Sequence, residues 1–85
     1  MPLQVSVVSA DREVWSGEAT MVVARTSIGQ IGILAGHEPV LATLAEGEVH
    51  VTTSENGRVS ARAEHGFLSV QNDVVTIVAG AAELV

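Results

Sequence analysis

Apolar and polar residues alternate along several short stretches of the chain, as they do in β-strands with one buried face. Residues 3–7 read Leu-Gln-Val-Ser-Val, and residues 48–53 read Glu-Val-His-Val-Thr-Thr. Successive side chains of a strand point to opposite faces, so a period of two places one face in a core. The pattern therefore predicts half-buried strands in both stretches, with a bulge or a doubly buried end at Val8, where the alternation stops.

Turn residues separate the apolar stretches along the whole chain. Asn56-Gly57 is the strongest hairpin signal, because both residue types accept the positive φ of a tight turn. Breaks are also expected at Gly17, at His65-Gly66 and at Gly80, and residues 74–79 form the most apolar strand, expected to be central. About nine or ten short strands and no helical period predict an all-β protein, a flattened β-sandwich of about ten short strands. The chain is expected to form one domain over residues 1–85.

Residues 29–41 combine glycines, short apolar runs and a proline. Residues 31–34 predict a very short buried strand, and the segment Gly36–Pro39 predicts a turn of fixed shape. Fixed loops on a rigid scaffold are common binding sites. Ile28 precedes this stretch on a predicted hairpin tip, where an apolar side chain requires either packing on the core or cover by a partner.

Composition narrows the function classes. The chain has 85 residues, a net charge of −6, no cysteine and no lysine, and its only aromatic residues are Trp15 and Phe67. A disulfide framework and a thiolate zinc site are excluded, and nucleic acid or an anionic membrane would require clustered positive charge. No apolar run approaches the roughly 20 residues of a membrane span, and the first residues do not form a signal peptide. Trp15 is expected to plug the core.

The histidines offer weak candidates for chemistry. His37 and Glu38 could serve as an acid and a base, but neighbouring strand residues point to opposite faces and no nucleophile accompanies them. His37, His50 and His65 do not have the spacing of metal ligands. We expect no metal and no cofactor, and His37 is expected to bond to loop backbone.

Four stretches carry a resemblance to a known family: residues 11–17, residues 29–41, residues 66–70 and residues 74–79. In order and spacing they resemble the N-terminal domain of the epsilon subunit of F-type ATP synthase over essentially the whole chain. The most specific part is Gly-x-Ile-Gly-Ile-Leu-x-Gly-His-x-Pro, which begins at Gly29.

The resemblance implies a non-catalytic rotor subunit in the central stalk of a proton-translocating ATP synthase. Such a subunit links the gamma subunit to the c-ring and supports the coupling of proton flow to ATP synthesis. It implies attachment to the cytoplasmic face of the bacterial plasma membrane through the complex alone. It also implies gamma contacts at Ser9, His37 and Ala42, and c-ring contacts at Ile28, Gly29 and Gln30.

The sequence departs from the family at several points. The family usually has an acidic residue in place of Gln30, a proline in place of Ala35 and a glycine in place of His65. It commonly continues into a C-terminal helical hairpin, which is not expected within these residues. An alternative function is a generic β-sandwich module that binds a ligand or a protein, although two aromatic residues equip it poorly for stacking sugars or bases.

Overall fold

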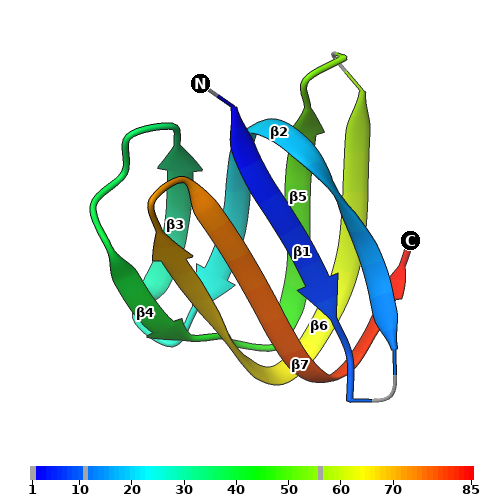
Figure 1. Cartoon of the computed structure of the whole chain (residues 1–85). Coiled ribbons are helices and arrows are strands. Elements are labelled where there is room, and N and C mark those ends of the chain that lie inside the picture. Colours follow the sequence, from blue (N-terminus) through cyan, green and yellow to red (C-terminus); the bar gives the residue numbers. More distant parts are fainter. Residues whose placement is uncertain (1, 11, 56) are drawn as a thin grey trace.

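The protein is an all-β sandwich, as predicted, seen here in a computed structural model that describes residues 2–10, 12–55 and 57–85 (Figure 1). Its strands are β1 (Leu3–Val8), β2 (Glu13–Thr26), β3 (Gly29–Leu34), β4 (Val40–Thr43), β5 (Gly47–Thr53), β6 (Arg58–Gln71) and β7 (Val74–Leu84). The described part of the chain contains no helix, and hence none long and apolar enough to cross a membrane.

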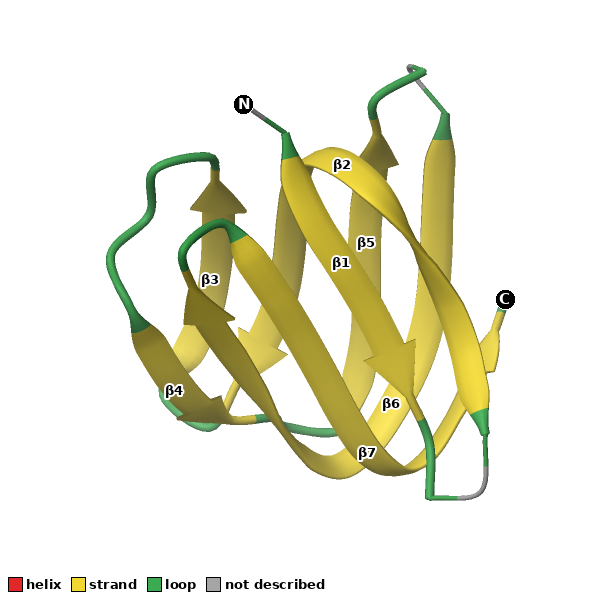
Figure 2. Ribbon diagram, viewed as in Figure 1, coloured by secondary structure: helices red, strands yellow, loops and turns green. Residues whose placement is uncertain are grey.

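Five strands close into a ring in the order β1, β7, β6, β5 and β2, because β2 also pairs with β1. All these pairs are antiparallel except β1 with β7. The ring is flattened into two layers (Figure 2). We call the layer of β4, the second half of β6, the first half of β7, β1 and the first half of β2 the front layer. The back layer contains β3, the second half of β2, β5, and the remaining halves of β6 and β7.

A bulge carries β2 from one layer to the other. Ala19 pairs with Thr53 but Met21 pairs with Thr52, so one extra residue is inserted in β2 between them. The insertion changes which residues face inward: Ala19 is buried before it, and Val22 and its alternate neighbours are buried after it. A bulge bends a strand and increases its twist, which is what passage between two layers requires. A second bulge near Val8 was anticipated from the sequence and is present, since the register of β1 with β2 shifts there.

The bends of β6 and β7 lie opposite one another. His65 adopts a φ of 54°, and at Gly66 a Cβ atom would lie 1.8 Å from the carbonyl oxygen of Val78. Only glycine allows the two backbones to approach this closely. Pairing keeps one register on both sides of the bend, from Ala61 with Leu84 to Gln71 with Val74.

The predicted number of strands was therefore wrong, although the fold class is confirmed. Gly17, Gly66 and Gly80 lie inside continuous strands and end none of them. The sequence-based breaks at His65-Gly66 and Gly80 mark bends at which one strand passes between layers. Each of β2, β6 and β7 has one half in each layer. When these halves are counted as separate strands, the total approaches the roughly ten strands expected from the sequence.

The core fills the space between the layers and consists of small and branched aliphatic side chains. It includes Leu3, Val5, Val7, Ala19, Val22, Ala24, Ile33, Leu44, Val49, Val51, Ala61, Ala63, Leu68, Val70, Val75, Ile77 and Ala79. Trp15 packs against this cluster and covers Gly17, as expected of a packing residue. The short strand predicted at residues 31–34 is present within β3, but it is buried on one side only: Ile33 is buried and Leu34 is 58% exposed, because β3 is an edge strand with one inner face.

Hairpin turns join β6 to β7 and, as predicted at Asn56-Gly57, β5 to β6. The β6–β7 connection is a two-residue turn in which Asn72 and Asp73 have φ values of 50° and 61°. The β5–β6 hairpin is closed by a hydrogen bond of 2.9 Å from the Thr53 N–H to the Gly57 carbonyl. The conformation predicted for Asn56 lies outside the described residues. The Gly57 N–H also donates to Thr53 Oγ1 at 2.9 Å.

Candidate functional site

The β2–β3 tip presents an apolar side chain to solvent on a well-braced turn. Ile28 is 96% exposed. The buried side chain of Thr26 stabilises the turn with two hydrogen bonds: its hydroxyl donates to the Gly29 carbonyl at 2.7 Å and accepts from the Ile28 N–H at 3.3 Å. Gly29 has a φ of 130°, which favours glycine, and the Ser27 N–H donates to the Thr43 carbonyl. The core does not cover Ile28, so packing on the core, one of the two reasons considered for an apolar tip residue, does not apply.

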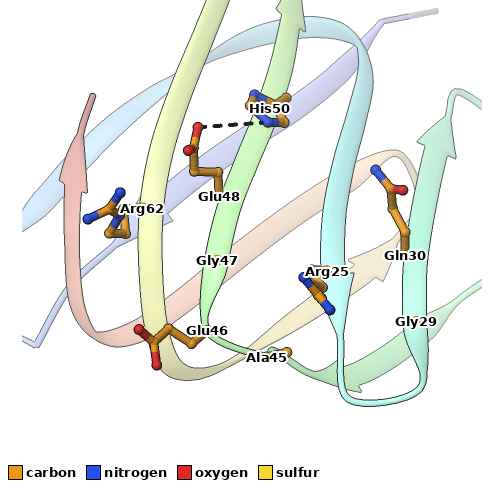
Figure 3. A pocket seen from close by; sticks show the side chains of 9 residues that line it. All are labelled: Arg25, Gly29, Gln30, Ala45, Glu46, Gly47, Glu48, His50 and Arg62. Atoms are coloured by element: carbon orange, nitrogen blue, oxygen red, sulfur yellow. Dashed lines mark ion pairs between the residues drawn. The ribbon is translucent and has the colours of Figure 1, made fainter.

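Gln30 lies at the rim of a concave surface of about 940 Å³ on the outer side of the back layer (Figure 3). Its lining includes the charged residues Arg25, Glu46, Glu48 and Arg62, and His50. The labelled side chains point in different directions and do not converge on one point.

His50 contacts two polar neighbours on this side of the sheet. Its Nε2 lies 3.9 Å from Glu48 Oε1, and its Nδ1 lies 2.9 Å from Ser60 Oγ. This surface carries both signs of charge, from Arg25 and Arg62 and from Glu46 and Glu48, which suits a solvated sheet face better than a pocket for one charged ligand. The described residues also contain no cluster of metal-binding side chains.

His37 lies half-buried in the β3–β4 loop, and its ring bonds to the backbone, as the sequence suggested. The ring Nδ1 lies 2.8 Å from the Glu38 carbonyl oxygen. The backbone N–H of His37 donates to the Leu34 carbonyl. The carboxylate of Asp73 accepts from the Gly36 N–H at 2.7 Å and so ties this loop to the β6–β7 turn. The ring is thus engaged by the main chain of Glu38, and this contact does not form the acid–base pair considered from sequence.

Ser9 and Ala42 lie at opposite sides of the front layer and do not meet His37. Ser9 follows β1 and is only 7% exposed, with its N–H and hydroxyl both donating to the Arg12 carbonyl. Ala42 pairs with buried Leu68, so its side chain points to the inner side of β4. A partner at these two positions would therefore contact their neighbours and the backbone more than their own side chains.

Four strands of the front layer, β4, β6, β7 and β1, present an uncharged outer face that sequence reasoning missed. The first half of β2 borders this face with two carboxylates: Glu13 pairs with Val8, and Glu18 pairs with Gln4 and accepts a hydrogen bond of 3.1 Å from its side-chain amide. None of the described residues in β4, β1, Gly66–Gln71 of β6 or Val74–Ala79 of β7 carries a charge. Cross-strand pairs bring the outward residues into rows: Leu41, Ser69, Thr76 and Ser6 form one row, and Thr43, Phe67, Val78 and Val8 form the next. We call the surface formed by these two rows, with Gln71, Val74 and Gln4, the uncharged face.

Apolar side chains on the uncharged face remain open to solvent. Leu41 is 75% exposed, Val74 is 47% exposed and Phe67 is 45% exposed. Within residues 74–79, Val74 and Val78 point outward and are apolar, like the buried residues between them. A sandwich strand needs only one apolar side, so these two valines were the sequence signal that could have predicted the uncharged face. The predicted central strand is confirmed in its position between β1 and β6, but alternate residues point away from the core.

The back layer contrasts with this surface. Its outward positions include Arg25, Glu48, Arg58, Arg62 and Glu83. Charged residues are depleted at the centres of protein interfaces and common on solvated surfaces. One uncharged face, one charged face and a braced apolar tip define a β-sandwich of the kind that acts through protein contacts.

The particular family follows from comparison with known proteins. The family model for the β-sandwich domain of the ATP synthase delta/epsilon chain matches residues 2–85, and the chain belongs to this family. It is 51% identical over 82 residues to an ATP synthase epsilon chain of Streptomyces griseus. The matched region covers 96% of this chain and 66% of that relative. It thus spans just under two thirds of that protein. A Micrococcus luteus epsilon chain is 52% identical, with 90% of its length covered, and one from Frankia casuarinae is 45% identical, with 99% covered.

Solved structures agree with the fold. A chain of the Euglena gracilis mitochondrial ATP synthase, in a structure of OSCP, F1 and the c-ring, superposes with a TM-score of 0.91 at 25% identity, covering 98% of this chain and 53% of that one. A chain of the Tetrahymena thermophila central stalk and c-ring structure gives a TM-score of 0.78 at 14% identity, covering 96% of this chain and 66% of that one; this similarity bears on the fold alone. The family resemblance drawn from sequence is confirmed.

Proposed function

We propose that this chain is a non-catalytic rotor subunit in the central stalk of a proton-translocating F-type ATP synthase. In this role it links the gamma subunit to the c-ring and supports the coupling of proton flow to ATP synthesis. Membership of the delta/epsilon family and the relatives named ATP synthase epsilon chain support the assignment. The complex would hold the chain at the cytoplasmic face of the bacterial membrane as a peripheral subunit.

The observation that carries the proposal is the partition of charge between the two layers. An uncharged sheet face with exposed Leu41, Phe67 and Val74 is suited to burial against a partner, whereas the charged back layer is suited to solvent. We assign the uncharged face to the gamma subunit. The predicted gamma contacts Ser9, His37 and Ala42 lie around the borders of the front layer and remain part of this proposal.

The c-ring contact is assigned to the β2–β3 tip. Ile28 offers exposed apolar area, Gln30 offers both a donor and an acceptor, and Gly29 fixes the turn between them. The hydrogen bonds of Thr26 hold the tip in one conformation, so a partner meets it with little entropic cost.

Reconstitution tests the proposal directly. The chain is added to an ATP synthase depleted of its epsilon subunit, and ATP-driven proton pumping is measured in membrane vesicles together with ATP hydrolysis. We expect pumping per ATP hydrolysed to recover. Hydrolysis without recovered pumping, at a concentration where the chain is incorporated, would contradict the proposal.

A generic binding module is the second candidate, and the concave surface of the back layer is the feature that favours it. Titration of the chain with nucleotide, sugar or metal ions, followed by NMR, separates the two functions. Saturable shifts at Arg25, His50 and Arg62 would favour the binding module, and an unchanged spectrum would favour the rotor subunit.

A further inference from the structure

Gly32, in the middle of β3, is a glycine that nothing in the described part of the chain explains. A Cβ atom built at this position meets no atom within 4 Å, and the residue does not have the positive φ of Gly29 or Gly36. Gly66, in contrast, is required by the close approach of β7. Glycine inside a strand weakens it and often marks a place where another backbone or a ligand approaches. Any group that approaches Gly32 would therefore come from outside the described part of the chain.

The strand that carries Gly32 also has an open edge. Among the described residues β3 pairs only with β2, in one regular register from Met21 with Leu34 to Thr26 with Gly29. In a hairpin closed by a two-residue turn the hydrogen-bonded pairs alternate, so the backbone N–H and C=O groups of Gln30 and Gly32 point away from β2. These groups are available to a further strand.

Proteins usually protect such an edge with a charge, a proline or a bulge, and β3 has none of these. Its six residues read Gly-Gln-Ile-Gly-Ile-Leu. The edge thus combines open hydrogen-bonding groups with a flat, uncharged surface, which is the arrangement of a strand that receives another strand.

Gly32 indicates the side chain that the incoming strand carries. On the outer side of the sheet it lies opposite Val23 and between the side chains of Gln30 and Leu34, which leaves a notch with an apolar floor. An aromatic or other bulky side chain opposite a strand glycine restores the missing packing. Both aromatic residues of this chain belong to other strands: Trp15 to β2 before the bulge, and Phe67 to β6.

We infer that β3 receives an extended segment of the gamma subunit, paired with the backbone groups of Gln30 and Gly32, with a bulky apolar side chain seated over Gly32. The side chain of Gln30 stays with the c-ring contact at the β2–β3 tip. This inference rests on the proposed function, which supplies gamma as the partner. The position of β3 next to the uncharged face supports this inference. β3 and β4 lie on the same side of the sandwich, and the loop with His37 joins β3 to β4, which carries Leu41 of the uncharged face (Figure 1). A second copy is a poor occupant, since each chain carries a charge of −6. The segment is therefore uncharged or basic.

Amide hydrogen exchange on the chain alone and in complex with purified gamma tests the inference. In the free chain the N–H groups of Ile31 and Ile33 exchange slowly, and those of Gln30 and Gly32 exchange fast. In the complex we expect exchange at Gln30 and Gly32 to slow by at least about tenfold. Gamma binding with unchanged exchange at both residues would overturn the inference and leave the proposed function standing, whereas a lack of gamma binding would contradict both. Slow exchange that appears in the free chain as its concentration rises would assign the edge to a second copy and would also overturn the inference.

Two variants at one position provide the matched control. Gly32→Pro removes the outward N–H, which an edge strand tolerates, and should weaken gamma binding by about tenfold or more. Gly32→Pro with unchanged affinity would contradict strand pairing. Gly32→Ala retains the N–H, and its methyl group meets no atom of the described chain, so the fold should be retained. The methyl group would enter the space that the incoming side chain fills, so gamma binding should weaken several-fold but clearly less than in Gly32→Pro. An equal loss in both variants would contradict pairing through the N–H.

Discussion

Gly66 provides the sharpest test of how the two layers are joined. Replacing it with alanine would place a Cβ atom 1.8 Å from the Val78 carbonyl oxygen and 2.6 Å from the Ala79 Cα, where real Cβ atoms essentially never come within 3.0 Å. The atoms in the way belong to the backbone of a paired strand, so no side-chain rotation can relieve the clash. The β6–β7 ladder must open at the bend for alanine to fit.

The cost can be bounded from general magnitudes. Overpacking in a well-packed site costs about 1–3 kcal/mol, and the rigid backbone on both sides places Gly66→Ala at or above about 3 kcal/mol. The lower entropy of alanine in the unfolded chain offsets about 0.4–1 kcal/mol of this at most. A domain of this size has a total unfolding free energy of about 4–13 kcal/mol, so the change removes a large part of it. The net loss of at least about 2 kcal/mol, at about 4–8 °C per kcal/mol, then predicts a Tm lowered by at least about 8 °C.

The control is Gly80→Ala, which lies across the same bend. A Cβ atom there would lie 3.6 Å from its nearest neighbour, an ordinary contact, so we expect a Tm within about 4 °C of the parent. Thermal unfolding followed by circular dichroism measures both variants. If Gly66→Ala and Gly80→Ala melted together, the close approach of β6 and β7 at the bend would be refuted.

Three further predictions follow from individual residues. Ile28→Asp should leave gamma binding unchanged and impair proton pumping in the reconstituted enzyme, because it puts a charge where the c-ring would cover an apolar side chain; lost gamma binding would reverse the surface assignment. His65→Gly should raise the Tm by about 3–6 °C, because a φ of 54° costs a histidine about 1–2 kcal/mol that glycine avoids, and the greater entropy of glycine in the unfolded chain offsets about 0.4–1 kcal/mol of this gain; a lowered Tm would show that the imidazole makes a stabilising contact. Gly57→Val should lower the unfolding free energy by about 1 kcal/mol, because a Cβ there lies 2.9 Å from Thr53 Oγ1; unchanged denaturant unfolding would contradict this.

The sequence predicted the fold class because local patterns decide it. The alternation at residues 3–7 and the turn signal before Val74 depend on neighbouring residues alone, and both are present in the structure. The number of strands depended on tertiary contacts instead. A glycine such as Gly66 reads as a break in the sequence, but β7 pairs across it and keeps the strand continuous.

The candidate site was predictable where it depends on one turn. Ile28 could be identified as an exposed apolar tip from Gly29 and the polar residues around it. The uncharged face could not, because its rows join strands that are far apart in the sequence, such as β1 and β7. The missed clue was an apolar residue on the outer side of the strand, as at Val74.

Charge placed on the two faces tests the central claim, that the uncharged face binds gamma. Phe67→Glu puts a carboxylate on that face, Leu41→Glu does so at its exposed rim, and Thr52→Glu is the matched change on the outer side of the back layer. With folding verified by circular dichroism, the affinity of each variant for purified gamma is measured by calorimetry. We expect Phe67→Glu to weaken binding by about 100-fold, Leu41→Glu by about tenfold or more, and Thr52→Glu by less than about threefold. Unchanged binding for Phe67→Glu and Leu41→Glu, or a loss confined to Thr52→Glu, would contradict the assignment of the uncharged face to gamma.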